Sequence, residues 1–285
     1  MSKNNLFIVT AFTIVLMFSF IFFIIPNAMV LYTTFNVLGV EDGNENYIYN
    51  LMRHVKIVFN GLYLKIYLRS LMVGLCTVFF TIIIGYPFAC AVYYTKSISL
   101  QRFLLASVII PFWTSSLIRT YSMVSLLRTH GFINKFLLSI GLINQPLDML
   151  YNLTAMVIGF TYTLIPLMVL PIYLSLFKIK SAVIEAAKDL GANNTQIFFS
   201  ILLPLSYGGI VSGSSMVLLS SLSMFYLSDI LGGSKYNLVG NLIKNKFLLS
   251  HDWQLSCSIS LIFYVVAAFF LVLQKRTLSF KLPSS

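Results

Sequence analysis

Long apolar stretches alternate with short polar segments along this chain. Six can be delimited, at roughly 7–31, 69–93, 103–126, 154–177, 206–230 and 255–273. Each is close to the ~20 residues that an α-helix needs to cross ~30 Å of hydrocarbon. We therefore expect an all-α polytopic membrane protein with six transmembrane helices, which form one transmembrane domain over residues 1–285.

The composition supports this expectation and affects how the positive net charge is interpreted. The chain is 58% hydrophobic and only 9% charged, too little charge to cover a soluble surface of this size. The formal net charge of +11 could suggest nucleic acid. The basic residues flank the apolar stretches, however, where they can meet anionic lipid headgroups. We expect membrane lipid as a partner and no nucleic acid.

The first apolar stretch follows Lys3 and could be read as a signal peptide. It is too long for the apolar region of such a peptide, and no clear small-residue cleavage site follows it. A retained first helix is expected.

The sequence carries no signature of an enzyme. Its three cysteines have no CxxC spacing, its three histidines are scattered in loops, and neither HExxH nor GxxxxGK[ST] occurs. We predict no catalytic residues, no metal site and no cofactor bound by this chain.

The polar segment after the fourth apolar stretch has strong helix signals. Ala182, Ala186 and Ala187 favour helix, and Ser181 is a plausible N-cap. Gly191 can adopt the left-handed conformation that ends a helix. A short helix that ends at this glycine is predicted.

A second short helix is expected next, capped by Asn193, Asn194 or Thr195, and Pro204 marks the entry to the fifth apolar stretch. Two short helices joined by a glycine turn would form a compact knob that can sit in a groove of a partner. An ordinary amphipathic loop is the alternative.

The spacing of this segment resembles the EAA loop of ABC importer permeases. Glu-Ala-Ala at 185–187 is followed by three residues, a glycine, nine residues and Ile-Leu-Leu-Pro at 201–204. The resemblance implies a type I ABC importer permease fold with a coupling loop at about 178–205, cytoplasmic termini, and a separate ATPase subunit that binds ATP and magnesium. The residues it assigns to ATPase coupling are Glu185, Ala186, Ala187, Asp189 and Gly191.

Two further strings are similar to permease subunits of spermidine/putrescine importers, a likeness that covers the chain from about residue 69 onward. They are Phe-Trp-Thr-Ser-Ser-Leu-Ile-Arg at 112–119 and Phe-Tyr-Leu-Ser-Asp-Ile-Leu-Gly-Gly at 225–233. This resemblance implies polyamine import across a bacterial inner membrane. The implied partners are a second homologous permease, two copies of the ATPase subunit and a periplasmic polyamine-binding protein.

A polyamine path needs carboxylates for the ammonium groups and aromatic faces for the methylenes. The residues we expect along it are Asp229, Tyr226, Phe225, Trp113 and Tyr121. As alternatives, Asp229 forms an intramembrane ion pair with Arg119, and Trp113 and Tyr121 belong to an interfacial aromatic belt. An ABC permease for an inorganic anion or a metal, and a stand-alone carrier or channel, remain the alternative functions.

Overall fold

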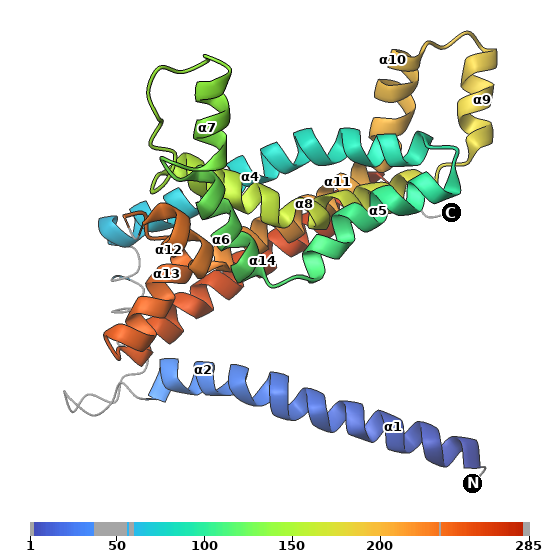
Figure 1. The fold of residues 1–285 in the computed structure, drawn as a ribbon. Coiled ribbons are helices and arrows are strands. Elements are labelled where there is room, and N and C mark those ends of the chain that lie inside the picture. Colours follow the sequence, from blue (N-terminus) through green and yellow to red (C-terminus); the bar gives the residue numbers. More distant parts are fainter. Residues whose placement is uncertain (1–2, 37–55, 57–59, 234, 282–285) are drawn as a thin grey trace. The chain divides into compact units, whose positions relative to one another are not determined.

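The computed structural model describes residues 3–36, 56, 60–233 and 235–281. The described secondary structure is helical, and no strand occurs in it (Figure 1). The N-terminal helices are α1 Lys3–Ser19, η1 Phe20–Ile24 and α2 Ile25–Asn36. The following ones are α4 Gly61–Tyr94, α5 Ile98–Trp113, α6 Ser116–Leu127, α7 Phe132–Ser139 and α8 Leu153–Phe177. The remaining ones are α9 Ser181–Asp189, α10 Asn194–Ile197, η3 Phe198–Leu202, α11 Leu203–Ser223, α12 Phe225–Gly232, α13 Val239–Lys244, η4 Asn245–Leu249 and α14 Trp253–Lys281.

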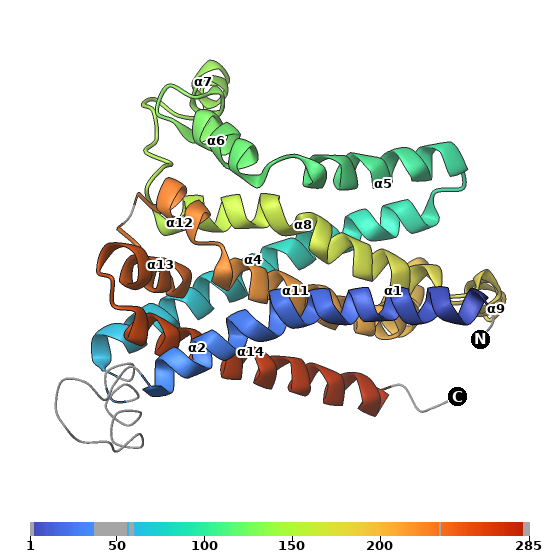
Figure 2. The ribbon, with the colours of Figure 1, turned by 90° about the horizontal axis from the view of Figure 1, so that it is seen from below.

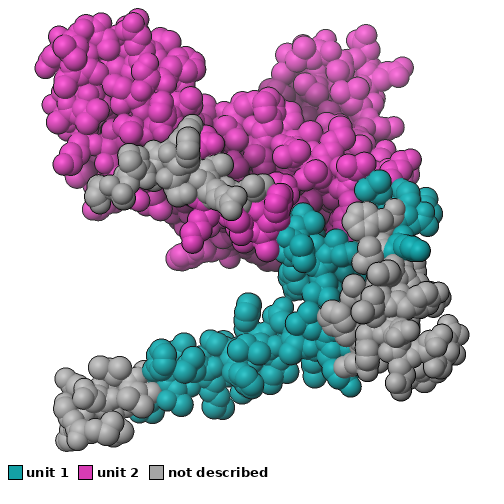
Figure 3. Space-filling view, turned by 180° about the vertical axis from the view of Figure 1, so that it is seen from behind, with its two compact units in different colours: residues 1–64, 242–266 teal, residues 65–241, 267–285 magenta. Residues whose placement is uncertain are grey.

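The contacts within the chain define two units, which Figure 3 distinguishes by colour. Unit 1 comprises residues 1–64 and 242–266, and unit 2 comprises residues 65–241 and 267–285. The prediction of one domain over the whole chain stays a prediction. Unit 2 contains α8 and α11 and both groups of candidate functional residues.

Helices long and apolar enough to cross a membrane confirm the predicted architecture. Five occur in the described part of the chain, and a bent pair brings the total to six if it counts as one span. The five are Phe12–Thr34, Gly61–Tyr94, Leu153–Phe177, Asn194–Ser223 and Trp253–Val272.

The third predicted span, 103–126, is broken near its middle. Helix α5 ends at Trp113, and the following helical segment bends away from it by 100°. Thr114 and Ser115 leave the helical conformation with ψ of 155° and 127°. The Thr114 hydroxyl donates to the Pro111 carbonyl at 2.6 Å, a local bond with which Ser and Thr compete against helix continuation.

The fifth predicted span, 206–230, is wrong at both ends. The helix begins at Asn194 and ends at Ser223, because Met224 adopts ψ of 80° and separates α11 from α12. The predicted path residues Phe225, Tyr226 and Asp229 therefore lie on a separate short helix.

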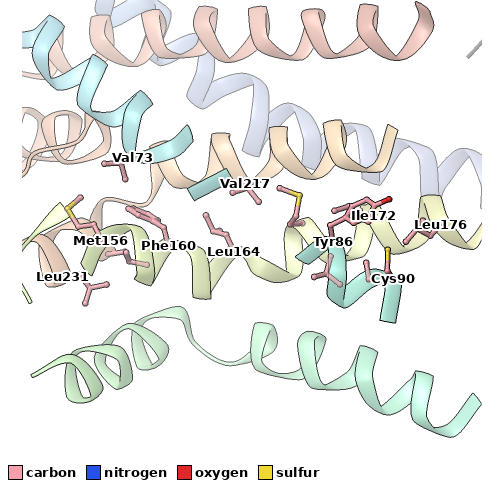
Figure 4. Packing of buried hydrophobic residues seen from close by; sticks show 14 of the residues in the cluster. Val73, Tyr86, Cys90, Met156, Phe160, Leu164, Ile172, Leu176, Val217 and Leu231 are labelled. Atoms are coloured by element: carbon pink, nitrogen blue, oxygen red, sulfur yellow. The ribbon is translucent and has the colours of Figure 1, made fainter. Parts of the chain in front are cut away.

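The core of unit 2 extends along the length of α8. Six of its residues, spaced four apart, have no exposed surface: Met156, Phe160, Leu164, Met168, Ile172 and Leu176. With 3.6 residues per turn, each step of four moves about 40° further around the helix, so this row winds gradually around α8. Figure 4 shows this row between side chains from neighbouring helices, including Val73 and Tyr86 of α4 and Val217 of α11.

Glycine allows α11 to approach α8 closely. A Cβ atom at Gly209 would lie 2.5 Å from the Pro171 carbonyl oxygen and equally close to the Ser175 hydroxyl. Any larger residue there would push the two helices apart, so the small residue sets their spacing.

Candidate functional site

The segment 178–205 forms a projecting knob at one end of unit 2 (Figures 1 and 2). We use the name knob for these residues. Its first helix, α9, buries Ile184 and leaves Glu185, Lys188 and Asp189 exposed. Ser181 is not the N-cap as predicted, because Lys180 occupies the cap position and makes no side-chain cap bond.

Gly191 ends α9 in the left-handed conformation, as predicted, with φ of +84°. The Gly191 amide donates to the Lys188 carbonyl at 2.8 Å, and the Ala192 amide donates to the Ala187 carbonyl at 2.9 Å. These two bonds form a Schellman motif and satisfy carbonyls that the helix end leaves free. The turn is therefore fixed by backbone bonds that need a glycine at this position.

Asn193 begins the second helix of the knob. Its side chain accepts from the Gln196 amide at 2.8 Å, and the Gln196 side chain accepts from the Asn193 amide at 2.9 Å. This reciprocal capping box confirms one of the three predicted caps. The sequence interpretation missed Gln196, although Asn-x-x-Gln is itself a signal for such a box.

The second helix continues without interruption into the membrane span. One widened turn, Phe198–Leu202, precedes Pro204, and in it the Leu203 amide donates to the Phe198 carbonyl five residues back. Proline lacks the amide that would bond four residues back. Helices α10, η3 and α11 form one span candidate of 30 residues, so the second helix of the knob is continuous with the membrane helix.

Two tyrosines of α4 attach the knob to the bundle. The Tyr86 hydroxyl lies 2.9 Å from the Ser206 hydroxyl, and its ring meets that of Phe198 edge-on at 5.6 Å. The Tyr93 hydroxyl donates to the Ile179 carbonyl at 3.3 Å. The segment that leads into the knob and the segment that leads out of it are thus both bonded to α4.

The outer surface of the knob exposes one large apolar residue next to a shallow groove. Leu190, at its tip, is 89% exposed. It adjoins a shallow groove of about 400 Å³ lined by Leu190, Gly191, Ala192, Gln196, Ile197, Ser200 and Ile201. Of the five predicted coupling residues, Ala187 is partly buried and the other four are exposed.

Helix α12 lies at the opposite end of unit 2 from the knob (Figures 1 and 2). It carries Phe225, Tyr226 and Asp229, and it lies against α6 and α8. The Tyr226 hydroxyl is buried and has no hydrogen-bond partner among the described residues. The Phe225 and Tyr226 rings lie 6.2 Å apart, edge to face.

Asn241 organises this end of the molecule. It is 1% exposed. Its amide group donates to Asp229 and, at 3.0 Å, to the Phe225 carbonyl. Its oxygen accepts from the Ser228 hydroxyl and, at 3.1 Å, from the Leu238 amide. The sequence interpretation did not assign Asn241 a role, although a lone amide in an apolar segment is the kind of residue that needs buried partners.

Arg119 and Asp229 lie on adjoining helices with different hydrogen-bond partners. Arg119 is 8% exposed, donates to the Thr163 carbonyl at 3.4 Å, and lies 5.7 Å from the centre of the Phe112 ring. Its Nε has no hydrogen-bond partner among the described residues. The ion pair between Arg119 and Asp229 stays a prediction.

The two predicted aromatic residues of the bent segment are exposed. Trp113, at the end of α5, is 84% exposed, and Tyr121, on α6, is 62% exposed. The structure therefore brings Phe225, Tyr226 and Asp229 together on one helix, whereas Trp113 and Tyr121 lie on the two arms of the bend.

Comparison with known sequences gives full-length relatives. No family model matches the chain. It is 38% identical over 268 residues to the spermidine/putrescine transport system permease protein PotB of Haemophilus influenzae, with 93% of this chain and 92% of that protein covered. It is 35% identical over 259 residues to the PotB protein of Escherichia coli K12, with 90% and 92% covered.

Solved structures show the same fold. A membrane subunit chain from a bacterial ABC transporter that imports the acidic polysaccharide alginate superimposes with a TM-score of 0.78 at 15% identity, covering 96% of each chain. A chain of the MetNI methionine ABC transporter, in an inward-facing conformation, superimposes with a TM-score of 0.57 at 18% identity, covering 75% of this chain and 93% of that one. Both confirm the predicted permease fold. From its identity to full-length relatives, the chain belongs to the family of PotB spermidine/putrescine transport system permease proteins.

Proposed function

We propose that this chain is the membrane subunit of an ATP-driven importer that carries polyamines, spermidine or putrescine, into the cytoplasm. The observation that carries this proposal is its identity of 35–38% to PotB permeases over about nine-tenths of its length. The fold shared with ABC importer chains supports it. The chain itself would hydrolyse no ATP, and ATP and magnesium would be bound by the ATPase subunit.

The knob supports the proposed coupling to that ATPase. It offers Leu190 as an apolar anchor and Glu185 and Asp189 as exposed charges. Its two helices are capped on both sides of the Gly191 turn, so it can move as a rigid body. In the proposed orientation the knob and both termini face the cytoplasm. The complete importer would add a second homologous permease, a second ATPase copy and a periplasmic polyamine-binding protein.

The residues of α12 support the proposal that the substrate is a cation. A carboxylate–ammonium contact at ~4 Å contributes about 4 kcal/mol at an effective dielectric near 20. The neighbouring Phe225 and Tyr226 rings can contact the methylenes and the charge. In the proposed mechanism Asp229 receives one ammonium group, and Trp113 and Tyr121 contribute aromatic surface further along the path.

The experiment on this site is uptake of labelled spermidine by vesicles that contain the assembled importer with Asp229→Asn. We expect the apparent KM to rise about tenfold or more, because a hydrogen bond to a charged group is lost. The matched control is Asp148→Asn, an exposed aspartate near Thr129. An unchanged KM and rate in Asp229→Asn would remove Asp229 from the path.

One observation favours a second candidate, an ABC permease for an inorganic anion. Arg119 is a buried cation whose Nε has no hydrogen-bond partner among the described residues. If sulfate or phosphate competed with uptake and Arg119→Gln abolished that competition, this second function would replace polyamine import.

A further inference from the structure

A groove lies at the root of the knob, where the knob meets the membrane helices. It has a volume of about 610 Å³. The end of α8, the start of α9 and the first turns of α11 enclose it. Its lining residues are Ser175, Lys178, Ile179, Lys180, Val183, Pro204, Leu205, Tyr207, Gly208 and Ser212. The proposed coupling role uses the tip of the knob and leaves this groove without an assigned function.

The charge of the groove is positive. Lys178 and Lys180 both line it, and no carboxylate is among its lining residues. The Gln274 side chain of α14 donates to the hydroxyl of Ser212, a lining residue, at 3.5 Å. Both lysines come from the connection between α8 and α9, and Ser175, Tyr207 and Ser212 add hydroxyl groups to the lining.

The position of the groove matches the headgroup layer of a membrane. Helix α8 has 25 residues, which is about 37 Å at 1.5 Å per residue and exceeds the ~30 Å of hydrocarbon. Lys178 follows its last residue directly. The groove also has apolar walls, Ile179, Val183 and Leu205, next to the lysines. A groove with a positive end beside an apolar wall is complementary to a molecule that has an anionic group next to an apolar part.

We propose that this groove binds the phosphate headgroup of an anionic phospholipid, such as phosphatidylglycerol. Lys178 and Lys180 donate to the phosphate oxygens, and the apolar walls contact the glycerol and the first methylenes. Basic pockets between membrane helices are established sites for anionic headgroups in other proteins. The bound lipid would hold the entry to α9 against α11.

The test is native mass spectrometry of the full-length chain in detergent, with phosphatidylglycerol or phosphatidylcholine added in equal amounts. We expect preferential retention of phosphatidylglycerol. A lysine near the surface of an anionic membrane contributes about fivefold in affinity. The double variant Lys178→Gln/Lys180→Gln should therefore bind phosphatidylglycerol about 25-fold more weakly.

Two further variants isolate the groove. Lys188→Gln removes a lysine of the knob that does not line the groove and should bind as the natural chain does. Lys178→Arg/Lys180→Arg keeps the charge and should retain the lipid. Equal retention of both lipids, or unchanged binding in the double glutamine variant, would overturn the proposal. Displacement of the lipid by an excess of inorganic phosphate would overturn the assignment to lipid and indicate a free-phosphate site.

Discussion

At the residue scale, the buried side chain of Asn241 makes four hydrogen bonds around Asp229. It joins Asp229, Ser228 and two backbone groups through one amide. A carboxylate held in this way is fixed in direction before a substrate arrives. Such preorganisation reduces the cost of ordering when a ligand binds.

Replacing Asn241 by leucine keeps its approximate size and removes all of these bonds. Each buried polar group left without a partner costs about 1–3 kcal/mol, so we expect the free energy of unfolding to fall by about 2–4 kcal/mol. Thermal unfolding of the purified chain in detergent measures this loss. The control is Asn144→Leu at an exposed position. Equal stability of the two variants would show that the bonds to Asn241 contribute little.

Residue-level predictions succeeded where one residue type alone fits the geometry. Gly191 was predicted to end a helix because few other residues adopt positive φ, and its φ is +84°. Ser181 was predicted to be an N-cap on its residue type alone, yet the helix begins one residue earlier, after Lys180. The residue at an N-cap position depends on where the chain enters the helix. Tertiary contacts decide that entry point, so residue type alone does not predict it.

At the element scale, the apolar stretches of the sequence predicted the membrane spans. They did not predict the breaks within two of those spans, after Trp113 and at Met224. The bent segment passes as one apolar span although Thr114, Ser115 and Ser116 are polar, so a long apolar window cannot show that the backbone turns there. The breaks come from local hydrogen bonds, such as that of the Thr114 hydroxyl, and from packing against α8. The grouping of Asp229 with Asn241 could not be predicted, because it depends on how α12 folds back.

In the knob, the proposed coupling role can be tested by substitutions that leave folding unchanged. Glu185 is exposed on α9, so Glu185→Lys should leave membrane insertion intact. We expect ATP-driven uptake to fall about tenfold or more, because like charges across a docking surface cost several kcal/mol. Co-purification of the ATPase subunit should fall with it.

Charge reversal outside the knob is the control for this prediction. Lys96→Glu lies at an exposed position in the connection between α4 and α5. It should preserve both uptake and co-purification. Normal uptake in Glu185→Lys would count heavily against the docking role, whatever the control shows.

At the scale of the whole unit, long helices connect the two groups of candidate functional residues. The knob is at one end of α8 and α11, and α12 with Asp229 is at the other (Figures 1 and 2). The buried row along α8 and the close approach at Gly209 pack these helices tightly. Tightly packed interiors transmit displacement instead of absorbing it. In the proposed mechanism, motion imposed on the knob by an ATPase therefore reaches the candidate substrate path.

The most direct measurement is uptake of labelled spermidine by vesicles that contain this chain with its partner subunits, with and without a functional ATPase. The account predicts uptake that requires ATP and that excess putrescine competes away. No spermidine uptake by an assembled complex that hydrolyses ATP would contradict the substrate. Uptake that persists without the ATPase would contradict the importer mechanism itself and favour a stand-alone carrier or channel.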